Sequence, residues 1–294
     1  RRHRAPRVRL AAGSRPMTTV APATAAPASE SWWGRAAVWM LPILVMVVVW
    51  HFITTGLDSI FFPTPAAIWE VLRDDYFSGS ASRLFLGDVV FDDLVPSLWR
   101  FALGWGFAVA SGILWGLLFG LRPGWRAWVE PLLEFGRAIP PPLVLGIVFV
   151  TFGAGDLPKA ALIAFGAVWP VLFNTIDGVM SVSEVRIASG RTFGWGRRER
   201  IVRIIVPDAG SSIFAGVRVS LGIGLILMVL TEFVGATNGL GYTIIRAQRG
   251  FDYAAMWAAL VVLAVVGLML NSLLVLFEAR LLGWRATSAR GLDV

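Results

Sequence analysis

The chain has 294 residues, of which 56% are hydrophobic and 15% are charged. This composition is typical of integral membrane proteins, because a soluble core of this length does not need so much apolar surface. The net charge of +7 would suggest nucleic acid in a soluble protein, but the basic residues cluster between apolar segments. There they set membrane orientation, so no nucleic-acid partner is expected. Cysteine is absent, which excludes a disulfide framework, a thiolate metal site and a cysteine nucleophile.

Residues 1–30 combine Arg with Ala, Pro, Ser and Thr without apolar periodicity, which predicts a disordered cytoplasmic tail in which Met17 is a candidate start residue. Six apolar runs follow, and they predict an all-α integral membrane protein with about six transmembrane helices. The runs cover residues 36–54, 97–121, 131–152, 160–179, 213–235 and 253–282. The first run is too long for a signal-peptide core, so we expect it to be retained. The transmembrane domain is expected over 31–285, and a second cytoplasmic tail over 286–294.

Prolines interrupt two of these runs. The third run contains Pro140, Pro141 and Pro142, and the fourth contains Pro170 and Asn174. Consecutive prolines remove backbone donors and bend a helix. In lipid, the freed carbonyl groups must be covered by other protein or by a water-filled path. The kinked runs are therefore expected to face such a path or a partner.

The distribution of arginine predicts the orientation of the chain. Six spans place both termini on one side of the membrane. The amino-terminal tail, the 122–137 loop, the 184–203 segment and the tail beyond Arg280 are Arg-rich, whereas the alternate loops are acidic or mixed. The positive-inside rule then makes both termini cytoplasmic. The acidic region is expected outside; it contains Asp74, Asp75, Asp88, Asp92 and Asp93.

Side chains suited to catalysis are sparse. The two histidines, His3 and His51, are not near a second candidate ligand, so no metal site and no enzymatic activity are expected. Lys159 is the single lysine and follows Pro158 rather than glycine, which excludes a phosphate-binding loop for ATP. Glu232 is the one carboxylate in the fifth run and lies near its outer end, which disfavours ion coupling. A partner ATPase is the expected energy source, with an ion gradient as the alternative.

The segment 184–207 is the longest strongly charged interruption of the apolar chain, and it combines arginines with the aliphatic run 201–206. Gly194 and Gly196 predict a break between two helices, 183–193 and 197–206. An amphipathic basic segment between two spans is expected to contact a cytoplasmic partner, the alternative being anionic lipid headgroups. Its arginines are Arg186, Arg191, Arg197, Arg198, Arg200 and Arg203.

Three residues separate the small residues 188–190 from Gly194, and nine more separate Gly194 from the sequence Ile-Ile-Val-Pro that ends at Pro207. This spacing resembles the loop of bacterial ABC importer permeases, which reads Glu-Ala-Ala, three residues, Gly, nine residues, Ile-x-Leu-Pro. Further segments resemble the nitrate, sulfonate and taurine branch of that family. They are SLWRF at 97–101, RAIPP at 137–141, PVLFNT at 170–175, EFVG at 232–235 and GLGY at 239–242. The resemblance covers about residues 63–285.

The resemblance implies a permease subunit of the bacterial inner membrane with the type I ABC importer fold. It implies a second permease copy, identical or different, two cytoplasmic ATPase subunits that bind ATP and Mg, and an external solute-binding protein. No cofactor is expected in this chain itself, and membrane lipid is the remaining partner. The implied solute is a small organic sulfonate, a nitrate-like anion or a related small nutrient. An ion-gradient-driven carrier and a membrane-embedded enzyme are the alternative functions.

In the family, the first helix of this loop sits in a groove of the ATPase. The sequence departs from the family pattern where the family Glu is Ala188 and where the family Leu is Val206. Losing the Glu removes a charged contact, so coupling is expected to rest on arginines and shape, or on pairing with a different permease. The residues that the resemblance assigns to ATPase coupling are Glu184, Ala188, Ser189, Gly190, Arg191, Gly194, Arg197 and Pro207.

Five side chains of the polar or kinked runs are candidates for lining the transport path: Trp169, Asn174, Met228, Glu232 and Asn271. Each has a structural alternative, such as packing at the Pro170 kink, filling the core or bonding a neighbouring helix. Glu232 is also a candidate for gating the outer mouth or for pairing with Arg246. Arg100 and Arg218 lie near the ends of their runs and are expected to snorkel to the membrane surface.

Overall fold

The computed structural model describes residues 32–57 and 59–283. The two expected tails, 1–30 and 286–294, lie outside the described residues. The chain divides into two units, residues 1–49 and residues 50–294, and each is taken by itself. In the first unit, the described residues belong to helix α1 (Trp32–Leu57), which continues past the boundary.

The regular elements of the described residues are all helical, as expected. In the part of the chain that the structure describes, five helices are long and apolar enough to cross a membrane, and a bent pair brings the number to six if it forms one span. The long helices of the second unit are α3 (Val95–Gly120), α6 (Asp156–Met180), α9 (Val206–Phe233) and α11 (Tyr253–Leu281). The shorter α-helices are α2 (Pro65–Val71), α4 (Pro123–Ala138), α5 (Pro141–Phe152), α7 (Glu184–Thr192), α8 (Arg197–Arg200) and α10 (Leu240–Arg249). Four short 3-10 or π segments complete the set: η1 (Leu72–Tyr76), η2 (Ala81–Arg83), η3 (Val90–Leu94) and η4 (Ile201–Ile205).

The third apolar run, expected as one span over 131–152, is divided into α4 and α5, which meet at 85°. Ile139 and Pro140 have extended backbone at the break. A residue that precedes proline avoids the helical region, so the consecutive prolines end α4 and start α5. With 12 residues, α5 is about 18 Å long, shorter than the ~30 Å hydrocarbon core of a bilayer.

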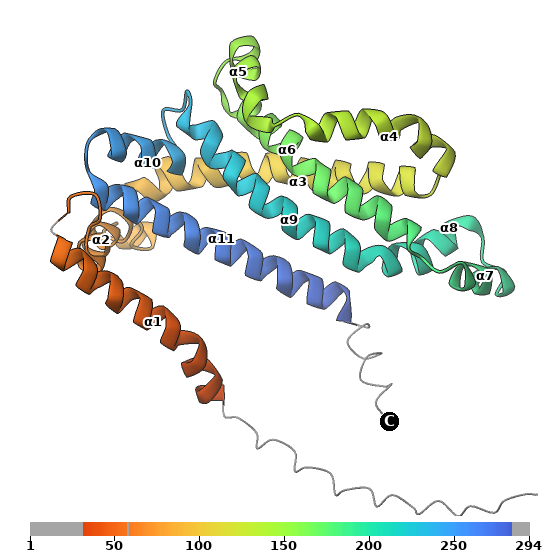
Figure 1. Ribbon diagram of the computed structural model, residues 1–294, viewed down its shortest axis with the longest axis horizontal. Coiled ribbons are helices and arrows are strands. Elements are labelled where there is room, and N and C mark those ends of the chain that lie inside the picture. The colour runs from red at the N-terminus through yellow and green to blue at the C-terminus, as the bar shows by residue number, and fades with distance from the viewer. Residues whose placement is uncertain (1–31, 58, 284–294) are drawn as a thin grey trace, which may run out of the picture. The chain divides into compact units, whose positions relative to one another are not determined.

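Helices α3, α6 and α9 pack side by side and form the core of the second unit (Figure 1). Small residues recur every fourth position along the face of α3 that meets α6, at Gly104, Ala108, Gly112, Gly116 and Gly120. This spacing keeps one side of a helix free of large side chains, and it permits the close backbone approach that stabilises helix pairs in membranes.

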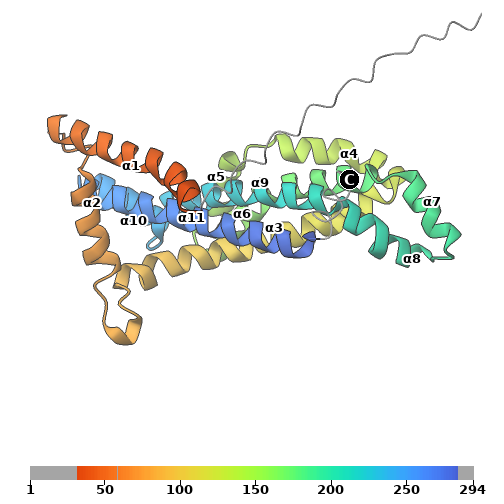
Figure 2. The same ribbon diagram turned by 90° about the horizontal axis from the view of Figure 1, so that it is seen from below.

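The two ends of this helical core carry different structures. Because α6 and α9 are joined through α7 and α8 and run in opposite directions, the end of α6 and the beginning of α9 lie together. The beginning of α3, the beginning of α6 and the end of α9 lie at the other end, beside α10 (Figure 2). The candidate coupling segment and Glu232 are therefore at opposite ends of the core.

Candidate functional site

Helices α7 and α8 form a hairpin that turns at Gly194, which has a φ of +74°. The amide of Gly194 donates to the carbonyl of Arg191 (2.9 Å), and the amide of Trp195 donates to the carbonyl of Gly190 (3.0 Å). These two bonds form a Schellman motif, in which a residue in the left-handed region closes a helix. The expected break at Gly194 is present for this reason.

The second half of the hairpin begins at Arg197 as expected, but it does not end at residue 206. Helix α8, the π segment η4 and helix α9 follow one another without interruption, so one helical stretch runs from Arg197 to Phe233. The amide of Gly196 donates to the Glu199 carboxylate (2.9 Å) and caps its first turn. The second half of the hairpin is thus continuous with a spanning helix. The whole stretch has 37 residues and is about 55 Å long.

Packing and one ion pair hold α7 against this long helix. Gly190 is buried, and a Cβ placed on it would lie 2.7 Å from Ile204 Cδ1. Arg186 of α7 forms an ion pair with Asp208 of α9. Two large apolar side chains are exposed here, Val185 on α7 and Phe193 directly after it, each 74% exposed. The hairpin therefore offers an apolar surface on a support that is fixed to α9.

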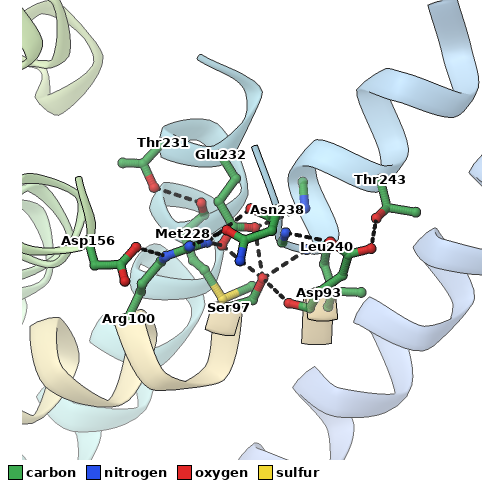
Figure 3. A network of polar contacts seen from close by, with 12 residues as sticks. Asp93, Ser97, Arg100, Asp156, Met228, Thr231, Glu232, Asn238, Leu240 and Thr243 are labelled. Carbon is green, nitrogen blue, oxygen red and sulfur yellow. Dashed lines mark hydrogen bonds and ion pairs between the residues drawn. The ribbon is translucent and has the colours of Figure 1, made fainter. Parts of the chain in front are cut away.

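The second feature is a buried polar network at the opposite end of the core (Figure 3). The carboxylate of Glu232 on α9 is fully buried and accepts hydrogen bonds from Arg100 Nη1 (2.7 Å) and from the Ser97 hydroxyl (2.8 Å) on α3. Arg100 is 2% exposed and also donates to Asp156 Oδ1 (2.6 Å) and to Asn238 Oδ1 (2.6 Å). Glu232 and Arg100 thus each have an opposite charge and neutral hydrogen-bonding groups around them, as a low-dielectric interior requires.

The network also holds the beginning of α10. The amide of Gly239 donates to Asp93 Oδ1 (2.8 Å), that of Leu240 to Ser97 Oγ (2.8 Å) and that of Gly241 to Glu232 Oε2 (2.9 Å). Thr243 in the first turn of α10 donates to Asp93 Oδ2 (2.7 Å). Three side chains from other elements therefore satisfy three backbone donors that a helix start leaves free.

Comparison with known proteins decides the family. Residues 108–283 match the model of the family described as binding-protein-dependent transport system inner membrane component. This chain belongs to that family. It is an ABC importer permease, which confirms the expected class and fold, including its place at the inner membrane.

The permease is similar to two bacterial proteins over most of their lengths. It is 30% identical to the putative aliphatic sulfonates transport permease protein of Bacillus subtilis, over 94% of this chain and 96% of that protein. It is 30% identical to the taurine transport system permease protein of Escherichia coli, over 82% of this chain and 87% of that protein. The structure of the MetNI methionine ABC transporter in inward-facing conformations matches 64% of this chain and 94% of its own, with a TM-score of 0.56 and 16% identity. This likeness shows the shared fold.

Most of the expected coupling residues lie on the exposed surface of the permease hairpin. Gly190 is buried and Pro207 is half-buried, so these two residues support the hairpin and are not part of its exposed surface. The exposed members are Glu184, Ala188, Ser189, Arg191, Gly194 and Arg197.

The path candidates are not gathered in one place. Met228 and Glu232 are fully buried on α9, whereas Trp169, Asn174 and Asn271 are half-buried on α6 and α11. The side chain of Asn174 donates to the carbonyl of Pro170 (2.8 Å) in its own helix. An apolar groove of about 1060 Å³ lies between α3, α9 and α11, and one of about 570 Å³ lies between α3 and α6. None of the five candidates lines either groove.

Two expectations for charged residues are wrong. Arg100 does not snorkel, because it is buried in the network. Glu232 does not pair with Arg246; it binds Arg100, and the Arg246 guanidinium lies over the ring of Tyr242 at 5.5 Å. The signal that could have found the pair is the presence of one arginine and one glutamate inside apolar helices, since each needs an opposite charge.

The sequence also did not reveal four other members of the network, Asp93, Ser97, Asp156 and Asn238. Lys159, in the first turn of α6, is a further buried cation at this end, at 3% exposed. Among the described residues, no group of three or more His, Asp or Glu side chains could hold a metal ion.

Proposed function

We propose that the α7–α8 hairpin of this permease docks into a partner ATPase and carries the movement of that ATPase into the membrane. The observation that carries the proposal is the combination of an exposed apolar and basic surface with a rigid connection. Val185, Phe193 and Arg191 face outward, while Gly190 and the Arg186 ion pair fix α7 to the helix that continues as α9. A force applied to such a hairpin moves α9 as a unit.

The proposed docking places the hairpin in the cytoplasm. The six arginines of 184–207 lie at the end of the core that also holds Arg122 and Arg126, whereas the acidic residues of 74–93 lie at the other end. The positive-inside rule supports a cytoplasmic hairpin and cytoplasmic termini. The network of Arg100 and Glu232 is then on the outer side, where an external solute-binding protein delivers its cargo.

A second permease copy is part of the proposal. Helix α5 is too short to span a bilayer, and the bend before it leaves carbonyl groups that Pro140 to Pro142 cannot bond. Large apolar side chains cover the outside of the bent pair; they include Trp128, Phe135, Ile147 and Val150, at 69–90% exposed. We propose that a second copy covers this surface and that the solute path runs between the two copies.

The proposed solute is a small organic sulfonate. Two relatives that are each 30% identical to this chain are named for aliphatic sulfonates and for taurine, which share the sulfonate group. Nitrate-like anions and other small nutrients remain the alternatives. Uptake of taurine, an alkyl sulfonate and nitrate by cells that carry the complete importer separates them, because the preferred solute competes for uptake of the others.

Copurification with the cognate ATPase tests the docking site. We expect the double variant Arg191→Glu/Arg197→Glu to lose the ATPase. A surface of the ATPase that binds arginine carries acidic groups, and these groups repel the introduced glutamates. Arg122→Glu is the matched control, since Arg122 is exposed outside the hairpin. Equal ATPase recovery with both variants would rule out docking through these arginines, and binding of the isolated permease to anionic vesicles alone would support the headgroup alternative.

Two measurements separate the remaining functions. Uptake that persists when the proton gradient is collapsed and ATP is maintained supports an ATP-driven importer, and uptake that stops supports an ion-driven carrier. The carboxylate of Glu232 already accepts hydrogen bonds from Arg100, Ser97 and Gly241, so it is not open to a transported ion. Turnover of a solute by the purified chain alone would support the enzyme alternative.

A further inference from the structure

Helix α10 begins on the fully buried carboxylate of Glu232 rather than in water. The amides of Gly239, Leu240 and Gly241 bind Asp93, Ser97 and Glu232, which belong to η3, α3 and α9. A helix start attracts negative charge, and here two of the three acceptors are carboxylates. We call the set Asp93, Ser97, Arg100, Glu232 and the amides of 239–241 the α10 anchor.

The anchor depends on glycine at two positions. A Cβ on Gly239, where φ is +120°, would lie 2.5 Å from Glu232 Cδ, and a Cβ on Gly241 would lie 2.6 Å from the Val229 carbonyl oxygen. No other residue permits the backbone to lie this close to the carboxylate. The turn between α9 and α10 is therefore shaped around Glu232.

Arg100 completes the anchor from the other side. Its guanidinium binds Glu232, and it also binds both the carbonyl (3.1 Å) and the side-chain oxygen of Asn238, next to the glycine turn. Arg100 thus contacts the turn and the carboxylate at once. Asp156 at the beginning of α6 binds the same guanidinium and is the solvent-facing member, with its side chain 57% exposed.

We propose that Arg100 and Glu232 are positioning residues that lock α10 and the 234–239 turn to the end of α9, so that a movement of α9 started at the hairpin reaches α10. The proposal rests on the proposed function, because the hairpin is where the movement starts. The reason is continuity: one helical stretch joins the hairpin at Arg197 to Glu232 and Phe233. Without the anchor, α9 would move and α10 would not follow.

The test separates positioning from simple stabilisation. Removing one member of a buried ion pair leaves an unpaired charge and destabilises the fold, whereas removing both is often tolerated. The double variant Arg100→Leu/Glu232→Leu removes the charged part of the anchor without leaving an unpaired partner of that pair, and it leaves the bonds of Asp93 and Ser97 to the amides of Gly239 and Leu240 in place. The matched control is Arg218→Leu/Glu278→Leu, which removes the ion pair between α9 and α11. Glu232→Gln is a second, milder variant.

The local readout uses the absence of cysteine. Ala247→Cys places a single thiol on α10 at a position that is 8% exposed. In the full permease in membranes, we expect maleimide to label this thiol about tenfold faster or more in the double variant, because three or more buried hydrogen bonds are lost. The labelling rate in the control is expected to match that of the parent. This measurement needs no ATPase, so it stands even if the hairpin docks elsewhere.

The functional readout is uptake per ATP hydrolysed in the assembled importer. We expect a loss of about tenfold or more in the double variant, at a melting temperature close to that of the parent, and no loss in the control. Unchanged labelling overturns the proposal, and so does faster labelling with normal uptake. If the double variant does not accumulate, Glu232→Gln decides by the same criteria. If neither accumulates, the pair serves folding alone and the proposal fails.

Discussion

Gly116 of α3 lies directly against Thr175 of α6: a Cβ placed on Gly116 would be 2.5 Å from the Thr175 Cβ. The same relationship repeats one turn away, where a Cβ on Gly112 would be 2.8 Å from the Val171 Cβ. The contact sets the distance between the two helices, and with it the place of Arg100 and Asp156 near their ends.

We predict that Gly116→Ala lowers the melting temperature of the permease in detergent. The added methyl group has no space between α3 and α6, and overpacking of this kind costs about 1–3 kcal/mol. Gly106→Ala is the matched control on the same helix, because no atom lies within 4 Å of its Cβ position. An equal melting temperature for both variants would mean that the helix pair separates easily, contrary to the close packing.

The second prediction concerns Gly190, where the added Cβ would meet the Ile204 side chain and the Arg200 stem. The nearest of those atoms, Ile204 Cδ1, is at the end of a flexible side chain, so we expect Gly190→Ala to keep uptake. Gly190→Leu is expected to displace α7 and to abolish uptake while the permease still inserts in the membrane. Uptake assays together with the amount of permease in membranes check this, and normal uptake with leucine would argue against fixed attachment of α7.

The third prediction concerns the turn of the hairpin. The space around Gly194 is open, so its requirement is conformational: the residue has a φ of +74°. A β-branched residue is strained there by about 1–3 kcal/mol, whereas asparagine adopts the left-handed region more readily. We expect Gly194→Val to uncouple ATP hydrolysis from uptake and Gly194→Asn to retain most uptake. The ratio of uptake to ATPase activity measures the difference, and full coupling in the valine variant would refute a role of this turn.

The fourth prediction concerns Tyr76 of η1, a buried side chain whose hydroxyl has no hydrogen-bond partner among the described residues. A buried hydroxyl without a partner costs free energy, so we expect Tyr76→Phe to raise the melting temperature slightly or leave it unchanged. Tyr242→Phe serves as the control, because Tyr242 is half-buried beside Arg246. A marked loss of stability in Tyr76→Phe would mean that the hydroxyl is bonded after all.

Burial, together with Asp93 and Asp75, raises the pKa of Tyr76 to about 12. The unfolded chain then loses this proton from about pH 10, whereas the folded chain keeps it. The free energy of unfolding therefore falls as the pH rises from about 10 to about 12, because only the unfolded chain releases the Tyr76 proton in this range. Difference absorbance of the three tyrosines should show one that ionises late, and its removal by Tyr76→Phe identifies it.

The described spanning helices could be predicted from hydropathy, because each long helix must be apolar along most of its length. The hairpin turn could also be predicted, since Gly194 and Gly196 have a local conformational meaning. The uninterrupted continuation from α8 through η4 into α9 could not, because 201–206 is apolar both in a short amphipathic helix and at the start of a span. The bend before α5 follows from prolines, but its angle of 85° depends on packing.

The amino-acid sequence by itself determined the membrane class, the approximate spans, the glycine turn of the hairpin and the resemblance to importer permeases, because these depend on composition and on residues close together in the chain. Only the tertiary structure decided which charges meet. Arg100 and Glu232 are 132 positions apart, and their pairing has no local pattern. It arises because α9 packs antiparallel to α3, which brings the beginning of α3 to the end of α9, where a buried charge is stable only beside its opposite.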